Sequence, residues 1–398
     1  MTTPDAISRA VVEHYAQVKR DLPWRRTRDP YAIWVSEIML QQTRVATVIP
    51  YWERWMAKFP TVSALASAPL DDVLAAWAGL GYYSRARNLW SGAREVGERW
   101  NGALPQRADE LRKVKGIGPY TAGAIASIAF GERAPLVDGN VARVLARVFA
   151  IPDDIKSTSG QRALWSRAGE LMTALPTSAA PGELNQGLME LGATICSPTE
   201  PRCLICPIGN HCEAARTGHQ AMFPVVAPRK KQHELPLLAR TLVWAESAGT
   251  IVLVRRRADG LFGGLWELPP IELVDALGGN VIDPAPIAHH DQLLSHRRMT
   301  VAVVRGRLPS RLAEPQDPGY DAIARVRIVD ATRLGIAAAT TAILTKYRDT
   351  PWTSIPRRSR SSPKVTTRSS KASGSSGSPR KTKTSGTRRL APPKGCTS

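Results

Sequence analysis

The sequence predicts a multidomain protein with an all-α domain first, a smaller α+β domain second and a disordered basic tail. Three observations support this fold class. In the first half of the chain, apolar residues recur every three or four positions, as they do on helices. Further on they form short runs rich in β-branched residues, which are typical of strands. At the end, Ser, Lys, Arg, Gly, Thr and Pro dominate, a composition that cannot build a core. The predicted parts are a helical domain at 1–217, a linker at 218–236, an α+β domain at 237–350 and the tail at 351–398.

The length and the charge of the chain limit which functions it can have. A chain of 398 residues is long enough for two domains and a tail. The formal net charge is +20, and twelve Lys or Arg lie in the tail, which has no Asp or Glu. The basic body indicates a polyanionic partner, above all nucleic acid. No apolar run of about 18 residues and no signal sequence is present, so we expect no membrane partner and a cytoplasmic location, associated with the nucleoid if the cell is bacterial. We also expect a monomer.

The segment from Val141 to Val148 illustrates the helical period. Its apolar residues recur at intervals of three and four, while Arg143 and Arg147 fall on another face. Pro and Gly punctuate such segments every 10 to 20 residues up to residue 217. In the second domain the strand-like runs are Thr241–Trp244, Ile251–Val254 and Met299–Val304, and a helical stretch, Thr340–Tyr347, closes it.

A glycine pair lies between two helical patterns in the segment Lys115–Ala122. Gly116 and Gly118 flank one apolar residue, so a tight turn with positive φ is possible there and Ile117 can point inward. Pro119 suits the first position of the following helix, whose open amides can receive a phosphate oxygen. The segment resembles the helix-hairpin-helix element of DNA repair proteins. An ordinary pair of antiparallel helices stays open as the alternative.

Four cysteines lie within seventeen residues, namely Cys196, Cys203, Cys206 and Cys212. A compact set of four thiolates is the ligand set of a [4Fe-4S] cluster, and the prolines between them make the segment an irregular loop. A tetrahedral zinc site is the stronger alternative, since two of the cysteines are separated by two residues. Two disulfides are a weaker one, because nothing else marks the chain as secreted. The remaining Cys396 lies in the tail.

Several segments together resemble the adenine DNA glycosylases of the MutY type, in the endonuclease III superfamily. The match covers residues 8–215 closely and continues more loosely to about 348. It implies an enzyme of base excision repair that removes adenine paired with 8-oxoguanine or guanine in double-stranded DNA. The segments that carry it are Trp34–Thr43, Gly79–Arg87, Gly116–Tyr120, Val137–Val141 and the four-cysteine loop.

Two carboxylates are the expected catalytic pair. Glu37 sits in an apolar run, and burial there would raise its pKa and keep a proton on it near neutral pH. By resemblance, Glu37 is the general acid that protonates the adenine ring. Asp138 precedes a helix that starts at about Gly139, so it is also a candidate N-cap, and we expect amides there to lower its pKa. By resemblance it stabilises the oxocarbenium-like sugar or bonds to it transiently, and Asn140 orients it or the attacking water. A solvated glutamate and a plain N-cap are the alternatives.

Position 120 discriminates within the superfamily. Relatives with lyase activity resemble endonuclease III and carry a lysine there, which forms a Schiff base with the opened sugar. Tyr120 therefore favours a monofunctional glycosylase, although simple helix packing is an alternative. The resemblance also makes Trp24 and Gln186 candidates for the adenine pocket.

The target base has to leave the duplex to reach Glu37. By resemblance, Gln42 and Tyr82 are wedges that fill the gap, and Arg85 and Arg87 would meet phosphates. The alternatives are a core tyrosine and ordinary surface charges.

The second domain resembles the MutT-type (Nudix) fold through the segment Gly263–Pro269. The following residues, Glu272–Gly279, lack the metal-binding set of a Nudix hydrolase, so we do not expect pyrophosphate hydrolysis. In the resembling family this domain recognises 8-oxoguanine through a Phe-Ser-His loop. Here Leu294 replaces the aromatic residue, while Ser295 and His296 are retained. A polar turn is the alternative for this pair.

Three other functions are compatible with part of the sequence. An endonuclease III-type pyrimidine-lesion glycosylase and lyase is opposed by Tyr120 and by the additional domain. A non-catalytic iron–sulfur DNA-binding module is opposed by the presence of Glu37, Asp138 and Asn140 together. A Nudix hydrolase fused to a DNA-binding domain fails because its metal ligands are missing.

Overall fold

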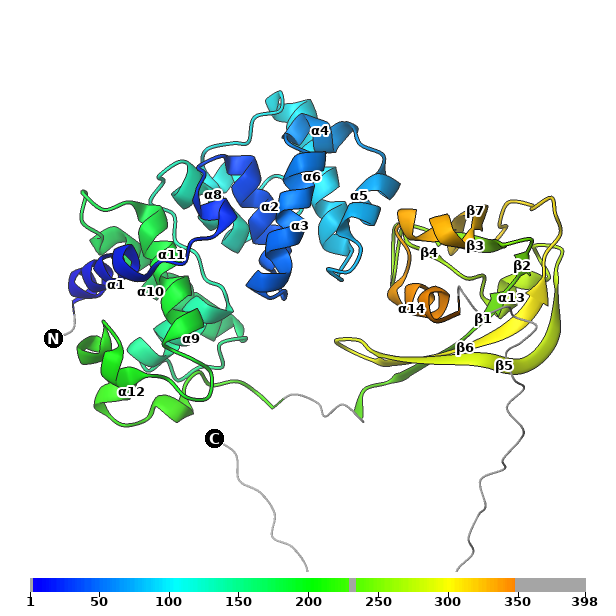
Figure 1. Cartoon of the computed structure of the whole chain (residues 1–398). Helices are drawn as coiled ribbons and strands as arrows, with labels where there is room; N and C mark the ends of the chain where they lie inside the picture. Colours follow the sequence, from blue (N-terminus) through cyan, green and yellow to red (C-terminus); the bar gives the residue numbers. More distant parts are fainter. Residues whose placement is uncertain (1–2, 229–233, 348–398) are drawn as a thin grey trace, which may run out of the picture. The chain divides into compact units, whose positions relative to one another are not determined.

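The computed structural model describes residues 3–228 and 234–347, and its first part is helical (Figure 1). Short 3₁₀ turns, η1 (Pro23–Arg25), η2 (Cys203–Ile205), η3 (Gly209–His211) and η4 (Gln220–Met222), lie between the helices. The helices are α1 (Pro4–Val18), α2 (Pro30–Leu40), α3 (Val45–Lys58), α4 (Val62–Ser67), α5 (Leu70–Trp77), α6 (Ser84–Trp100), α7 (Ala108–Leu111), α8 (Pro119–Ala129), α9 (Gly139–Val148), α10 (Thr158–Ala174), α11 (Pro181–Thr194) and α12 (Glu213–Arg216).

Two apolar cores hold these helices together. The first is built by α2 to α8 around the fully buried side chains of Trp34, Trp55 and Trp77. The second is built by α1, α9, α10 and α11. Helix α8 belongs to both, because its Ile125 packs into the first core and its neighbour Ala124 into the second. The seam between the cores is where the candidate site lies.

Helix α2 runs through the first core rather than along its surface. Asp29 caps its start by accepting the amide of Tyr31 at 3.0 Å, and Pro30 occupies the first helical position. All its residues from Tyr31 to Met39 are buried, a pattern typical of a helix enclosed on all sides. A glutamate in such a helix is therefore removed from solvent.

Helix α9 has the predicted apolar face, with Val141, Val144 and Val148 buried. Arg147, predicted to lie on another face than these valines, is not a surface residue, because it is 2% exposed. An arginine at that position in the pattern resembles a surface residue, but here backbone carbonyls from distant segments surround it.

The second part is an α+β domain with two sheets. In one, β1 (Leu237–Trp244) runs parallel to β6 (Arg298–Arg307), and β5 (Asn280–Leu293) pairs antiparallel on the other side of β6. The other contains β2 (Glu246–Ser247), β3 (Thr250–Arg256), β4 (Trp266–Glu267) and β7 (Tyr320–Arg327). The helical elements of this domain are α13 (Ile271–Val274), η6 (Ile328–Arg333) and α14 (Ala338–Tyr347). The three predicted strands and the closing helix are confirmed, and with them the order of a helical domain followed by an α+β domain.

The exact domain boundaries stay predictions. The basic centre of the predicted linker and the predicted disordered tail lie outside the described residues. Within the described ranges, no helix is both long and apolar enough to cross a membrane.

Candidate active site and four-cysteine loop

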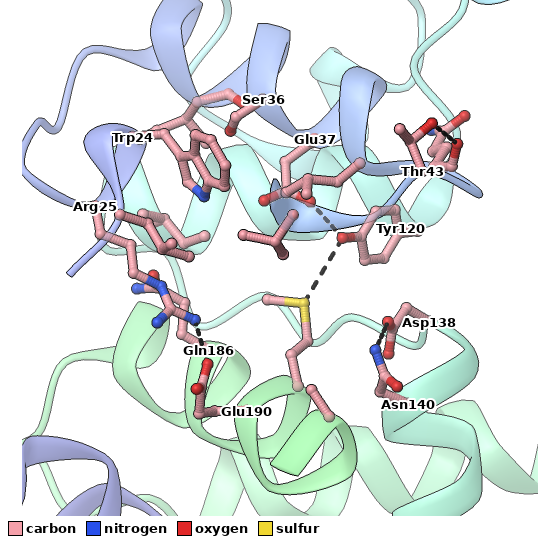
Figure 2. A pocket seen from close by; sticks show the side chains of 18 of the residues that line it. Trp24, Arg25, Ser36, Glu37, Thr43, Tyr120, Asp138, Asn140, Gln186 and Glu190 are labelled. Atoms are coloured by element: carbon pink, nitrogen blue, oxygen red, sulfur yellow. Dashed lines mark hydrogen bonds and ion pairs between the residues drawn. The ribbon is translucent and has the colours of Figure 1, made fainter. Parts of the chain in front are cut away.

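A cavity of about 600 Å³ opens at the seam between the two helical cores (Figure 2). Its wall comes from η1, α2, α8, α11 and the start of α9. Among the site residues predicted from the sequence, it brings together Trp24, Glu37, Gln42, Tyr120, Asp138, Asn140 and Gln186. Segments more than 100 residues apart in the chain thus converge on one space.

Glu37 lies on the wall of the cavity that α2 forms, with 5% of its surface exposed. Burial raises its pKa from 4.5 to about 7, against the opposing effect of a hydrogen bond from Tyr120. Nearby Asp138 adds to the rise by disfavouring a second negative charge. The predicted burial and raised pKa are confirmed, and this carboxyl can carry a proton at neutral pH.

Tyr120 is the second residue of α8 and faces Glu37 across the cavity. Its hydroxyl hydrogen-bonds Glu37 Oε2 and lies 3.6 Å from the sulfur of Met189. Burial, followed by the charge of Glu37, raises the pKa of Tyr120 well above 10, so the phenol stays neutral. Tyr120 is therefore a hydrogen-bond donor fixed beside the carboxyl of Glu37.

Asp138 is the N-cap of α9, as predicted. Its Oδ1 accepts the amide of Val141 at 2.7 Å, and its Oδ2 accepts Asn140 Nδ2 at 3.0 Å. We expected these bonds to lower its pKa. That expectation is wrong, because burial outweighs the bonds and raises the pKa of Asp138 above its ordinary value. The bonds still hold both carboxylate oxygens in fixed directions.

The opposite end of the cavity contains an ion pair that the sequence did not reveal. Glu190 on α11 is 2% exposed and accepts Arg25 Nη2 at 2.8 Å and Arg20 Nη2 at 3.0 Å. Burial alone would raise the pKa of Glu190, but the two arginines lower it, so it is ionised. Gln186 lies one helical turn before Glu190. This spacing of four residues places both side chains on one face of α11, and it was the only feature that could have drawn attention to Glu190 as a pocket residue. Arg20 and Arg25 precede Glu190 by 165 residues or more, so no local pattern indicates that these residues form an ion pair.

Gln42 on the wall of the cavity and Tyr82 in the loop before α6 have left-handed backbones without being glycine. Gln42 has φ 58° just after α2, and Tyr82 has φ 47° just before α6. Such conformations are uncommon for these residue types and require support from their surroundings. Tyr82 is 47% exposed, in keeping with a ring that is free to contact a ligand.

Arg85 supports these two backbone conformations. The expectation that Arg85 contacts a phosphate is wrong. The guanidinium is buried, and burial lowers its pKa to about 10. Every bond from it goes to the segments that carry Gln42 and Tyr82, so it is not directed toward solvent. Its acceptors are the carbonyls of Ile38, Met39, Gln41, Leu80 and Gly81 and the hydroxyl of Thr43. Arg87 is half-buried, and its contact with phosphate stays a prediction.

The glycine hairpin is exposed, with Ile117 buried beneath it as predicted. Gly116 has φ +84°, and a Cβ there would come within 2.7 Å of Asn88 Cβ, so both conformation and space favour glycine. Gly118 does not have the positive φ that was expected for the glycine pair. It is the N-cap of α8 with φ −85°, and its vicinity is open. A single positive φ is enough to turn the chain, and open amides remain at the start of α8.

The four cysteines, all half-buried, line one small apolar cavity beneath α9. Arg147 fixes this loop. Its guanidinium lies 3.3 Å from Cys196 Sγ and donates to the carbonyls of Ser197 at 2.6 Å and Pro198 at 3.0 Å. It also donates to the carbonyls of Gln220 and Phe223, which tie the following segment to the same point. Among the described residues, no three His, Cys, Asp or Glu side chains come close enough to share a single metal ion.

In the second domain, Ser295 and His296 lie exposed in the turn between β5 and β6, closed by a 2.9 Å bond from the Leu294 amide to the Arg297 carbonyl. Elsewhere in this domain, Glu267 of β4 is buried, and its Oε2 forms an ion pair with Arg240 Nη1 at 2.6 Å. The roles of the turn residues stay predictions.

Comparison with known proteins gives a consistent result. Residues 35–169 match the family model of the HhH-GPD superfamily base excision DNA repair proteins. The chain is similar to the adenine DNA glycosylase of Homo sapiens, with 42% identity over 313 residues that cover 66% of this chain and 57% of the relative. It is 35% identical to the adenine DNA glycosylase of Buchnera aphidicola subsp. Baizongia pistaciae over 251 residues, 63% of this chain and 69% of the relative. Against a thermostable thymine-DNA glycosylase structure, the TM-score is 0.49 at 28% identity, covering 54% of this chain and 97% of the other. The chain spans 48–61% of the length of its human, plant, rat and mouse relatives.

Proposed function

The chain belongs to the adenine DNA glycosylase family, and we propose that it hydrolyses the bond between adenine and deoxyribose in duplex DNA. One observation carries the proposal. A single cavity presents a buried Glu37 with a pKa of about 7 and an Asp138 whose two oxygens are held by hydrogen bonds. One group can give a proton near neutral pH while the other faces the sugar, the division of roles found in glycoside hydrolysis.

The reaction runs in two stages. Glu37 gives its proton to a ring nitrogen of adenine, and the bond from C1′ to the base breaks with both electrons leaving on the base. The cationic sugar that forms is stabilised by Asp138, or is captured by it as a transient ester. Water then adds at C1′ and its proton is taken up by a carboxylate or by solvent. Asn140 holds Asp138 in place for both stages.

The far end of the cavity suits the adenine ring. Trp24 offers an apolar face, and Gln186 offers both a donor and an acceptor for the edge of a purine. Glu190, ionised between two arginines, can accept from the exocyclic amine, while Arg25 can donate to a ring nitrogen. The set matches a base that presents donors and acceptors side by side.

Tyr120 in place of lysine supports hydrolysis without strand cleavage. A Schiff base needs an amine at the sugar, and no lysine occurs among the described residues that line the cavity. Tyr120 instead holds Glu37 by a hydrogen bond, which positions the acid rather than a nucleophile.

Several exposed features support binding to a duplex. Gln42 and Tyr82 are placed to fill the gap left by the flipped adenine. The open amides of α8 after Gly116 and Gly118 suit a phosphate. Ser295 and His296 would contact 8-oxoguanine, with Leu294 giving a smaller apolar contact than an aromatic ring.

The residues around the cysteine cavity fit a [4Fe-4S] cluster. A single zinc ion needs all four sulfurs about 2.3 Å from one point, whereas these cysteines line the wall of a shared cavity. Cys196, Cys203, Cys206 and Cys212 would be the ligands, and Arg147 would balance part of their negative charge. When bound, the cluster would cross-link the loop and supply no electrons, because hydrolysis moves none.

The proposed substrate is adenine opposite 8-oxoguanine or guanine. The proposed form is a monomer in the cytoplasm, associated with the nucleoid if the cell is bacterial. The test is single-turnover excision on duplexes with adenine opposite 8-oxoguanine, opposite guanine and opposite thymine, alongside a thymine glycol duplex. Each reaction is analysed with and without alkali, and Asp138→Asn serves as the inactive control.

Cleavage of the adenine strand after alkali, with the 8-oxoguanine and guanine duplexes favoured over the thymine duplex, would support the proposal. Cleavage of the thymine glycol strand alone, without alkali, would move the assignment to a pyrimidine-lesion glycosylase and lyase. Binding without excision of any base would indicate a non-catalytic DNA-binding module.

A further inference from the structure

A second cavity, of about 300 Å³, adjoins the base pocket. The two share four lining residues, Arg20, Arg25, Ile128 and Gln186. The second cavity continues from these residues to the end of α1, the end of α8 and the start of α11, and neither carboxylate of the reaction lines it. The two spaces are therefore neighbours separated by a wall of a few side chains.

The second cavity lies at the end of the pocket that is remote from the sugar site. In Figure 2, Asp138 lies on one side of the pocket and Arg25 and Gln186 on the other, with Glu37 between them in this view. If Asp138 faces C1′, the adenine ring must extend past Glu37 toward Arg25 and Gln186. Once the bond breaks, the base lies between the abasic sugar and the shared wall.

The lining of the second cavity combines five cationic side chains with the carboxylates of Asp21 and Glu183. Arg20, Arg25 and Arg26 are each paired with a carboxylate. Lys19 and Arg28 are exposed, with no ion pair found for either within the described part of the chain. Arginine and lysine have donors and no acceptors. A ligand that fits such a lining is small and presents several acceptors for the cationic side chains together with a donor for Glu183.

We propose that this cavity is the departure site of the excised adenine, a role that rests on the proposed glycosylase activity. Free adenine is small and carries ring nitrogens that accept hydrogen bonds, which the arginines and lysine can satisfy. The cavity volume is at the lower end of the range for small-molecule sites, sufficient for one nucleobase. The base leaves past Gln186 and Arg20 while the abasic strand still covers the mouth of the pocket.

Arg20 is suited to act as the movable part of the wall. Its side chain is 42% exposed, whereas that of its partner Glu190 is 2% exposed. Arg25 is 13% exposed and also holds Glu190, so the carboxylate keeps one partner when Arg20 swings away. The passage can therefore open without leaving a buried charge unpaired.

The test blocks the second cavity without touching the first. Ala180, the N-cap of α11, lines the second cavity and not the base pocket. Ala180→Trp would fill the space, and Ser178→Trp, at an exposed position two residues earlier, is the matched control. Duplex with labelled adenine opposite 8-oxoguanine is reacted under single-turnover conditions. The protein–DNA complex is then separated rapidly from free base, and excised adenine is counted in each fraction.

We expect the unaltered protein and Ser178→Trp to release adenine while the abasic strand is still bound. Ala180→Trp should cut at a similar rate and retain the adenine until the DNA dissociates. Equal release from Ala180→Trp would overturn the inference, as would release from the unaltered protein only together with DNA. If Ala180→Trp fails to excise, Thr27→Trp on the other wall of the cavity is measured in the same way. Absence of excision by the unaltered protein would instead refute the proposed function.

Discussion

Replacing Glu37 by glutamine should abolish excision and, at the same time, make the protein more stable at high pH. The pKa of Glu37 is raised by burial from 4.5 to about 7. That difference corresponds to about 3 kcal/mol, at 1.36 kcal/mol for each tenfold change in the acid constant. The charged carboxylate is therefore an unfavourable group in the folded protein, and glutamine removes the charge while keeping the shape.

The sign of the pH effect follows from linkage. The folded-state pKa lies above the unfolded value, so proton binding by Glu37 favours the folded protein fully below about pH 4.5. This contribution is lost as the pH rises through 7. Between pH 5 and pH 8 the stability of Glu37→Gln relative to the unaltered protein should increase by about 2–3 kcal/mol. In a domain of about 200 residues this corresponds to roughly 5–10 °C in Tm.

The same pKa governs the rate. At pH 7 about half of Glu37 is protonated, whereas a carboxyl of ordinary pKa would be protonated to about 0.3%, a difference of about 150-fold in the acid form. The single-turnover excision rate should fall about tenfold for each pH unit above 7, because the protonated fraction of Glu37 falls by that factor. Thermal unfolding at pH 5 and pH 8, and excision between pH 6 and pH 9, measure the two effects. Glu98→Gln on the exposed face of α6 is the control.

A Tm difference between Glu37→Gln and the unaltered protein that does not change from pH 5 to pH 8 would refute the reasoning. An excision rate that is flat through pH 7 would do so independently. The control should show neither effect, because an exposed glutamate meets the same solvent in the folded and unfolded chain.

Three further predictions address other parts of the site. Asp138→Asn should lower the excision rate by at least about 10³-fold while lesion-duplex affinity, measured by gel shift, changes little; near-normal excision would show that the charge is not needed. Arg85→Met should weaken duplex binding and excision together and lower Tm, since it leaves buried carbonyls without donors at about 1–3 kcal/mol each; loss of salt dependence alone would restore the phosphate role. Arg147→Lys should reduce iron content after purification, because one ammonium cannot reach all the acceptors of a guanidinium, and unchanged iron content would contradict its role at the loop.

Much of the fold was predictable because local patterns specify it. The period of three and four identified α9, and the glycine pair identified the turn before α8. Glu37 stood out because a lone acid in an apolar run has few neighbours to pair with along the chain. Asp138 stood out because an acid before a helix is a common cap.

The arginines could not be placed from sequence. Arg85 and Arg147 occur in patterns that resemble surface helices, yet both are buried because backbone carbonyls from remote loops surround them. Glu190 acquires its partners from residues 165 or more positions away, so no spacing rule connects them. The direction of the Asp138 pKa was missed for a related reason, since burial depends on how two cores meet and not on the cap itself.

The six acceptors of Arg85 join two loops that a duplex would meet at different points. If Gln42 and Tyr82 are the proposed wedges, they would act not as two independent probes but as one stiff unit, because Arg85 joins the segments that carry them. A stiff wedge would not have to be ordered anew at each base pair, so on the proposed function the time spent on undamaged pairs would be short. Search along DNA and insertion at a lesion would then differ mainly in how easily the base pair opens, and the weakness of the mispair would decide the target.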